Sequence, residues 1–132
     1  MIDGGLLVLS RFPIIETEFK TYNYGVLSDA LSQKGVLYCK IDIHGRILHL
    51  FQTHTQATYL DTGVEDFRAT LDARIDQLRT IRKFIELKTR NATPNQLIIM
   101  AGDMNVNGIP IDKQHHQYRE LSKNNVSFNL IY

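Results

Sequence analysis

The sequence has a single cysteine, Cys39, among its 132 residues, and it lacks tryptophan. One cysteine can form neither an internal disulfide nor a cysteine-based zinc site, and it leaves the redox compartment open. Cys39, Ile41 and Ile43 alternate with the polar residues Lys40 and Asp42. We therefore interpret Cys39 as a buried small hydrophobe and not as a nucleophile.

A large net charge is also lacking, because 15 Lys and Arg residues against 14 Asp and Glu residues leave a formal charge of only +1. No overall field therefore draws the chain to nucleic acid or anionic lipid, and any contact with a polyanion has to be local. No apolar run approaches the roughly 18 residues of a membrane-spanning helix, and no basic-then-apolar leader opens the chain. What is present, 43% hydrophobic and 22% charged residues, fits a soluble globular domain or a piece of one.

Two segments near the start of the chain predict strands. Residues 6–9 form a short apolar run between glycine and proline residues, which is typical of a buried strand. Residues 14–22 alternate loosely between polar and apolar side chains, as an outer strand does.

Residues 35–43 and 46–54 are rich in β-branched and aromatic side chains, which favours two further strands. They flank His44 and Gly45, a pair suited to a tight turn. We therefore expect these two strands to pair antiparallel as a hairpin.

A long helix is predicted after the hairpin. Thr62 and Glu65 have the spacing of a capping box, in which the two side chains satisfy backbone donors of the first helical turn. Apolar residues then recur at steps of four and three, which places one stripe against a sheet and leaves charged positions in water. The apolar stripe consists of Phe67, Leu71, Ile75, Leu78, Ile81 and Ile85. The predicted solvent-exposed positions are Arg68, Asp72, Asp76, Arg79 and Lys83.

The last part of the chain predicts one strand and one weak helix. Residues 97–101 form a continuous apolar run, which is typical of a central strand covered on both faces. Residues 111–124 are weakly helical, with Tyr118 and Leu121 as inward anchors. Strands followed by a helix and another strand indicate a layered α/β fold.

Polar side chains follow two of the predicted strands at their ends. Asp103 and Asn105 come directly after the 97–101 run, and His54, Thr55 and Gln56 close the second hairpin strand. A carboxylate suits a divalent metal or a water proton, and an amide suits a phosphate oxygen. The alternative is structural: an Asx turn, in which the Asp and Asn side chains bond only the backbone, and a histidine that serves only packing. The functional interpretation requires the two strand ends to meet at one rim of a sheet.

The remaining histidines and Arg11 receive no role. His44 lies in the predicted turn, and His49 lies on the strand face opposite His54. His115 and His116 lack a carboxylate at ligand spacing on a rigid element.

Taken in order, several blocks of this sequence resemble the neutral sphingomyelinase branch, of bacterial type, of the endonuclease/exonuclease/phosphatase superfamily. The first two blocks are more typical of that branch than of the nucleases, which share mainly the histidine and the Gly-Asp-x-Asn elements. The blocks are Asp3-Gly4-Gly5 with Ser10-Arg11-Phe12-Pro13-Ile14, Ser32-Gln33-Lys34-Gly35, Thr53-His54-Thr55-Gln56-Ala57, Gln77-Leu78-Arg79 with Phe84-Ile85, Gly102-Asp103-Met104-Asn105-Val106-Asn107, and Gln117-Tyr118 with Leu121.

The resemblance implies part of a four-layered α/β sandwich, the DNase I-like fold, with the active site at one rim. It implies an enzyme that hydrolyses sphingomyelin to ceramide and phosphocholine with Mg²⁺ or another divalent cation. His54 would stabilise charge on the phosphate, Asp103 would orient or deprotonate the attacking water, and Asn105 would hold a phosphate oxygen. Asp103 and Asn105 would also be the metal ligands, and the substrate would be a phospholipid at a membrane surface.

The family pattern also contains an upstream Asn and metal-binding Glu and a closing Asp-His dyad, which this chain does not carry. We therefore expect residues 1–132 to be the central part of a catalytic domain of about 250 residues, truncated at both ends. We expect this chain alone to be inactive and marginally stable, because the missing strands would leave apolar faces uncovered. The intact protein would be secreted or membrane-associated, and its oligomeric state is open.

Two alternatives stay open. The same three polar residues would serve a nuclease or a phosphoinositide phosphatase of the superfamily, although the near-neutral charge does not favour a stable nucleic-acid partner. The chain could also be a truncated, non-catalytic domain that binds lipid or protein.

Overall fold

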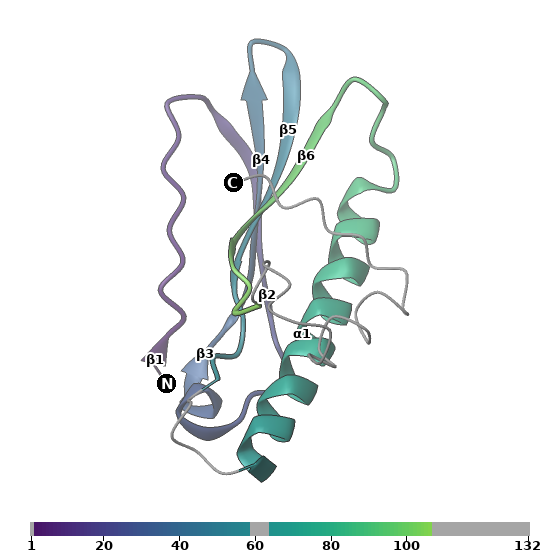
Figure 1. The fold of residues 1–132 in the computed structure, drawn as a ribbon. Coiled ribbons are helices and arrows are strands. Elements are labelled where there is room, and N and C mark those ends of the chain that lie inside the picture. Colours follow the sequence, from purple (N-terminus) through teal and green to yellow (C-terminus); the bar gives the residue numbers. More distant parts are fainter. Residues whose placement is uncertain (1, 59–63, 107–132) are drawn as a thin grey trace.

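In a computed structural model, which describes residues 2–58 and 64–106, a four-stranded sheet packs against one long helix (Figure 1). The strand order is β2-β4-β5-β6, and helix α1 (Val64–Thr89) runs along one face of the sheet. The strands of this sheet are β2 (Ile14–Thr21), β4 (Gly35–Ile43), β5 (Arg46–His54) and β6 (Leu97–Asp103). The capping Thr62, the predicted 111–124 helix, His115 and His116 lie outside the described residues.

The predicted hairpin is confirmed. Strands β4 and β5 pair antiparallel from Val36 opposite Thr53 to Ile43 opposite Arg46. Both turn residues have positive φ, 53° at His44 and 84° at Gly45, which suits the right-handed twist of the flanking strands.

Strand β2 is the outer strand that the sequence predicts, since it pairs only with β4 and every one of its residues is exposed. The end of α1 is fixed against it by Lys88, whose Nζ donates to Glu16 Oε1 at 2.7 Å and to Glu18 Oε2 at 2.5 Å. The same ammonium lies 5.0 Å from the centre of the Tyr38 ring. Charge pairing and ring contact together hold helix and sheet at this end.

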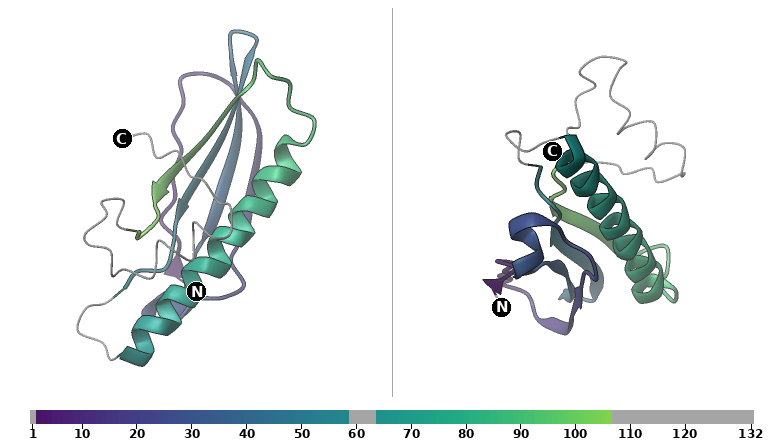
Figure 2. Two further views of the ribbon diagram at one scale, coloured as in Figure 1. Left: turned by 45° about the vertical axis from the view of Figure 1, so that its right-hand side comes forward. Right: turned by 90° about the horizontal axis from the view of Figure 1, so that it is seen from below.

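The strand predicted at residues 6–9 is wrong. These residues form no strand, and Leu7 and Leu9 are 69% and 86% exposed. The segment runs along the side of the sheet away from α1 (Figures 1 and 2). Before it, β1 (Ile2–Asp3) pairs parallel with β3 (Ser32–Gln33), which follows the short 3-10 helix η1 (Leu27–Leu31). A strand needs a neighbour for its backbone groups, and an apolar run does not reveal whether one is within reach.

The long helix is confirmed, but its buried face differs from the predicted stripe in the first half. Leu78 and Ile81 are buried as predicted, whereas Leu71 and Ile75 are only half-buried. Arg68, Asp72, Arg79 and Lys83 are exposed as expected, and Asp76 is half-buried; the side chain of Phe67 lies outside the described set. Among the described side chains of α1, the buried ones are Thr70, Ala73, Arg74, Gln77, Leu78, Ile81 and Phe84.

The core lies between α1 and one face of the sheet. It is a cluster of mostly aromatic and aliphatic side chains: Tyr22, Val36, Tyr38, Phe51, Leu78, Ile81 and Phe84. Cys39 is 2% exposed, and burial raises the pKa of its thiol, so its interpretation as a buried hydrophobe is confirmed.

Strand β6 forms as predicted, but not as a central strand covered on both faces. It lies at the edge of the described sheet, and Leu97, Ile98 and Ile99 are 58%, 48% and 40% exposed. An apolar run indicates only that a strand can be covered, not what covers it.

Among the described residues, no helix is long and apolar enough to span a membrane.

Candidate functional site

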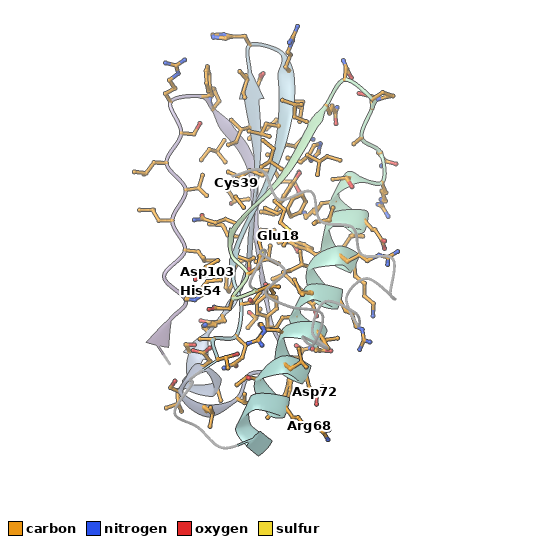
Figure 3. All side chains as sticks on the ribbon, in the orientation of Figure 1. Glu18, Cys39, His54, Arg68, Asp72 and Asp103 are labelled. Carbon is orange, nitrogen blue, oxygen red and sulfur yellow. The ribbon has the colours of Figure 1, made fainter. Side chains whose placement is uncertain are left out.

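The ends of β5 and β6 meet at one edge of the sheet. The two strands are parallel, and their register places His54 directly opposite Asp103 (Figure 3). His54 is half-buried and Asp103 is exposed. The predicted meeting of the two strand ends is therefore confirmed, whereas the roles of the residues stay predictions.

Gly102 permits this close approach. Its φ is +133°, and a Cβ atom placed there would lie 1.8 Å from the carbonyl oxygen of Thr53. Any other residue would force β6 away from β5 one position before Asp103. The glycine before the aspartate is thus a steric requirement of the pairing.

The segment from Asp103 to Asn105 contains the turn that the structural alternative requires. Asn105 has a positive φ of 48°, and its backbone N–H donates to Asp103 Oδ1 at 2.8 Å. The side chain of Asn105 also bonds the backbone, because its Nδ2 donates to the carbonyl oxygen of Thr55 at 3.0 Å. The printed bonds of both side chains are therefore those that the structural alternative expects. Within the described part of the chain, Asp103 Oδ2 and Asn105 Oδ1 have no hydrogen-bond partner. Among the described residues, these two oxygen acceptors remain available at the strand end where His54 lies opposite Asp103.

Thr55 connects this turn to β5, a role that the sequence did not reveal. It is fully buried, its N–H donates to the carbonyl of Asp103 at 2.9 Å, and its Oγ1 donates to the carbonyl of Met104 at 2.6 Å. Its own carbonyl accepts the hydrogen bond from Asn105. The polar Thr-His-Thr pattern was a signal of a strand end, but it could not indicate these partners.

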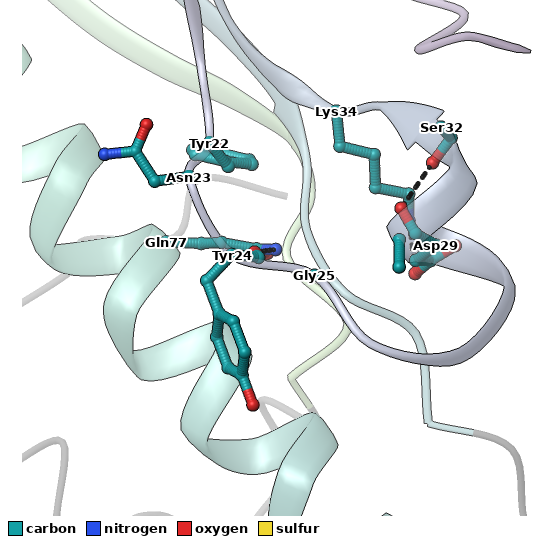
Figure 4. A pocket seen from close by; sticks show the side chains of 9 residues that line it. Tyr22, Asn23, Tyr24, Gly25, Asp29, Ser32, Lys34 and Gln77 are labelled. Atoms are coloured by element: carbon teal, nitrogen blue, oxygen red, sulfur yellow. Dashed lines mark hydrogen bonds and ion pairs between the residues drawn. The ribbon is translucent and has the colours of Figure 1, made fainter. Parts of the chain in front are cut away.

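A polar network behind Thr55 was also missed. Lys34, 9% exposed, donates from Nζ to the carbonyl of Thr55 and to Asp29 Oδ2, both at 2.8 Å. The same Asp29 oxygen accepts from the N–H of Ala57 at 3.0 Å. Lys34 and Asp29 also line a polar pocket of about 180 Å³ beside η1 (Figure 4). None of His54, Asp103 and Asn105 lines it.

Arg74 and Gln77, near the middle of α1, face this network, which explains why the helix buries polar side chains there. Gln77 Oε1 accepts from the N–H of Gln56 at 2.7 Å, and Gln77 Nε2 donates to the carbonyl of Tyr24 at 2.9 Å. Arg74 Nη1 donates to the carbonyl of Gln56 at 3.2 Å, and burial lowers the pKa of its guanidinium. Burying these side chains is tolerable because each has partners. The loop after β5 is therefore held from two sides.

Of the histidines without an assigned role, the two that the structure describes, His44 and His49, have structural partners. His49, 3% exposed, lies between the hydroxyl of Tyr38 and the amide oxygen of Gln96, each at 2.9 Å. His44 meets the ring of Phe12 edge-on, with 5.3 Å between ring centres. Arg11 lies over the same ring at 4.9 Å. All of these contacts lie away from Asp103.

Comparison with known proteins supplies the family. A sphingomyelinase of Dictyostelium discoideum is 39% identical over 129 residues, which cover 82% of this chain and 28% of the relative. Sphingomyelinase C of Bacillus cereus is 36% identical over 122 residues, covering 92% of this chain and 35% of the relative. The chain belongs to the sphingomyelinase family. No family model matches it.

The sphingomyelinase fold is also evident in three dimensions. A crystal structure of beta toxin from Staphylococcus aureus, with bound magnesium ions, is 28% identical, has a TM-score of 0.76, and covers 98% of this chain and 41% of that one. The expected α/β architecture, part of a DNase I-like sandwich, is thereby confirmed. The chain spans only about a third of its curated sphingomyelinase relatives, 28% and 35% of the two above. That residues 1–132 are the central part of the domain stays a prediction.

The donor set for a divalent cation in the described part of this chain is small. Among the described residues, no group of three or more His, Cys, Asp or Glu side chains could hold a metal ion. The two available oxygens, Asp103 Oδ2 and Asn105 Oδ1, are hard donors of the kind that Mg²⁺ and Ca²⁺ bind. These residues therefore fit a partial divalent site that further ligands would have to complete.

Proposed function

We propose that the full-length protein carrying this chain is a metal-dependent phosphodiesterase that hydrolyses sphingomyelin to ceramide and phosphocholine. The observation that carries the proposal is the register of β5 and β6, in which His54 and Asp103 are direct neighbours at one strand end. The similarity to sphingomyelinases supports sphingomyelin as the proposed substrate of this pair.

In this proposal His54 acts on the phosphate. Its ring is half-buried at the end of β5, where the strand limits its freedom. An imidazole N–H that donates to a non-bridging phosphate oxygen stabilises the negative charge that grows in the transition state. His54 would therefore lower the barrier without forming a covalent bond.

Asp103 would orient or deprotonate the attacking water. Its Oδ1 is occupied by the N–H of Asn105, which leaves Oδ2 for water. Asn105 would hold a phosphate oxygen through the second hydrogen of Nδ2, since the first is directed to Thr55. Both side chains come from one short turn, so their spacing is nearly fixed.

Asp103 and Asn105 would also hold Mg²⁺, or another divalent cation, through their free oxygens. When bound, the cation would act as a Lewis acid and neutralise charge on the phosphate. The protein residues would orient the water and the phosphate, and the N–H of Asn105 holds one carboxylate oxygen of Asp103 in place. We further propose that the substrate is presented at a membrane surface and that the intact protein is secreted or membrane-associated.

The test measures hydrolysis of sphingomyelin liposomes, plasmid DNA and phosphoinositide by the full-length protein, with Mg²⁺ and with EDTA. The proposal expects choline-phosphate release from sphingomyelin alone, abolished by EDTA. Asp103→Ala should lose about 10²–10⁴-fold in kcat, whereas Asp72→Ala, an exposed carboxylate on α1, should keep wild-type activity. Cleavage of DNA or phosphoinositide instead would refute sphingomyelin as the substrate and assign the cleaved compound in its place. No activity on any of the three would favour a non-catalytic binding domain.

A further inference from the structure

Large apolar side chains are exposed around η1, at the end of the sheet where the candidate site lies. Tyr24, Leu27 and Leu31 are 44%, 41% and 67% exposed. The start of β4 follows η1 closely and lies opposite the end of β5, where His54 meets Asp103 (Figure 1). The exposed apolar side chains and the candidate site therefore share one end of the molecule.

The segment that carries these side chains is held in place from beneath. The carbonyl of Tyr24 accepts a hydrogen bond from Gln77 Nε2 at 2.9 Å. The N–H of Val26 donates to Gln56 Oε1 at 3.0 Å. Both glutamines are buried. A surface segment that is fixed by buried partners presents its outward side chains at a constant position, as binding loops on a rigid scaffold do.

Packing does not explain why the apolar side chains of this segment are exposed. None of the residues of η1, all of which the structure describes, is buried. Leu27 has a φ of 56°, in the left-handed region, where a residue with a Cβ atom is disfavoured. Backbone strain of this kind is concentrated at functional sites. An exposed leucine on a strained backbone therefore indicates a surface with a partner.

The charge of the segment indicates which kind of partner fits. Between residues 22 and 33 the only charged side chain is Asp29. It is 11% exposed and pairs with Lys34 at 2.8 Å. The surface around η1 thus lacks the exposed Lys and Arg residues with which proteins bind anionic lipid. Uncharged leucine and tyrosine side chains suit instead the interface of a bilayer with zwitterionic headgroups.

We propose that Tyr24, Leu27 and Leu31 form a membrane-contact surface that inserts into the interface of a bilayer of phosphocholine lipids. The inference rests on the proposed function for the lipid that is then cleaved, whereas the contact itself needs no catalysis. Insertion of η1 brings the shared end of β5 and β6 towards the headgroups, where the phosphodiester of such a lipid lies. The surface thereby determines how the site meets its substrate.

The first test measures binding of the full-length protein to vesicles of sphingomyelin and phosphatidylcholine, in EDTA to prevent metal-dependent hydrolysis. The double variant Leu27→Ser/Leu31→Ser should bind about 10–100-fold more weakly than the wild type. Leu87→Ser is the matched control and should bind normally, because Leu87 is 54% exposed but lies in the last turn of α1, far from η1 (Figure 1). Wild-type affinity of the double variant, or binding that requires phosphatidylserine, would overturn the inference.

The second test compares hydrolysis of sphingomyelin in vesicles with hydrolysis of a short-chain, water-soluble sphingomyelin. The ratio of the two kcat/KM values should fall by about 10–100-fold in the double variant and stay at the wild-type value in Leu87→Ser. An equal loss on both substrates would contradict the inference, because it would assign η1 to the site itself. If the wild type binds vesicles through η1 but cleaves neither substrate, the proposed function fails and the membrane contact stands.

A fluorescent label reports the contact even if the double variant does not fold. Leu31→Cys carries an environment-sensitive fluorophore, and Leu87→Cys carries the same label as the control; Cys39 is 2% exposed and does not compete for it. Vesicles should shift the emission from position 31, and not that from position 87, to shorter wavelength. An unchanged emission at position 31 would refute the contact. Short-wavelength emission without vesicles would refute it as well, because another part of the full-length protein would then cover η1.

Discussion

Gly102→Ala should be the most damaging single-methyl change in the described sheet, because it tests the contact that joins β5 to β6. The added Cβ would lie 1.8 Å from the Thr53 carbonyl oxygen, 2.8 Å from the Thr53 carbonyl carbon and 3.0 Å from its nitrogen. All three are backbone atoms, so no side-chain rotation can relieve the clash. Either β6 separates from β5 at this point or both strands shift.

Two costs combine at Gly102. A non-glycine residue at φ +133° is strained by about 1–3 kcal/mol, and forcing an extra carbon into a filled space costs about 1–3 kcal/mol. Together they predict a loss of about 2–6 kcal/mol in the free energy of unfolding. Gly45→Ala is the matched control, since Gly45 has φ +84° but nothing lies within 4 Å of its added Cβ. It should cost about 1–2 kcal/mol.

Urea denaturation of the full-length variants measures both values from the midpoint at unchanged slope. The kcat/KM of the same variants provides a second measurement, because a shift of about 1 Å at Asp103 is expected to lower it by about 100-fold. Gly45→Ala, at the opposite end of the hairpin, should retain its activity. Equal destabilisation by the two substitutions, with equal activity, would refute the tight β5–β6 approach.

Three further predictions concern single contacts. Thr55→Val removes the donor to the Met104 carbonyl and should cost about 1–3 kcal/mol in urea denaturation; an unchanged midpoint would show that this carbonyl finds another partner. The hydrogen bond from Lys88 lowers the pKa of Glu16, so its stabilisation is present above the ordinary value of 4.5 and is lost as pH falls through the lowered value. Lys88→Met should therefore flatten the acid side of the stability profile, and an unaltered slope would contradict the pairing. Cys39 should react with a thiol reagent only as fast as the protein unfolds, because burial raises its pKa and blocks access; rapid labelling of the native protein would disagree.

Local chemistry sufficed for the elements whose partners are close in sequence. The hairpin followed from two β-rich runs around His44 and Gly45, where the turn itself sets the register. The helix followed from its apolar repeat. The meeting of His54 with Asp103 is a contact between distant residues, and it was predicted only because both strands end in polar side chains. For the hairpin and the helix, the pattern carries the information that decides the structure.

Distant partners decided the rest. The middle of α1 buries Arg74 and Gln77 because the loop after β5 offers backbone groups there, and the apolar repeat of the helix does not reveal this. Residues 6–9 are apolar yet unpaired, because pairing depends on which strand edge is within reach. The links from Thr55 to Lys34 and Asn105 span 21 and 50 positions. Such contacts exist only once the sheet has formed.

The most direct test of the central claim is sphingomyelin hydrolysis by the full-length protein in Mg²⁺, with Asp103→Ala and Asp72→Ala measured beside the wild type. The account predicts phosphocholine release that Asp103→Ala lowers by about 10²–10⁴-fold and that Asp72→Ala leaves unchanged. Wild-type turnover in the Asp103→Ala protein would contradict the assignment of the site to the shared end of β5 and β6.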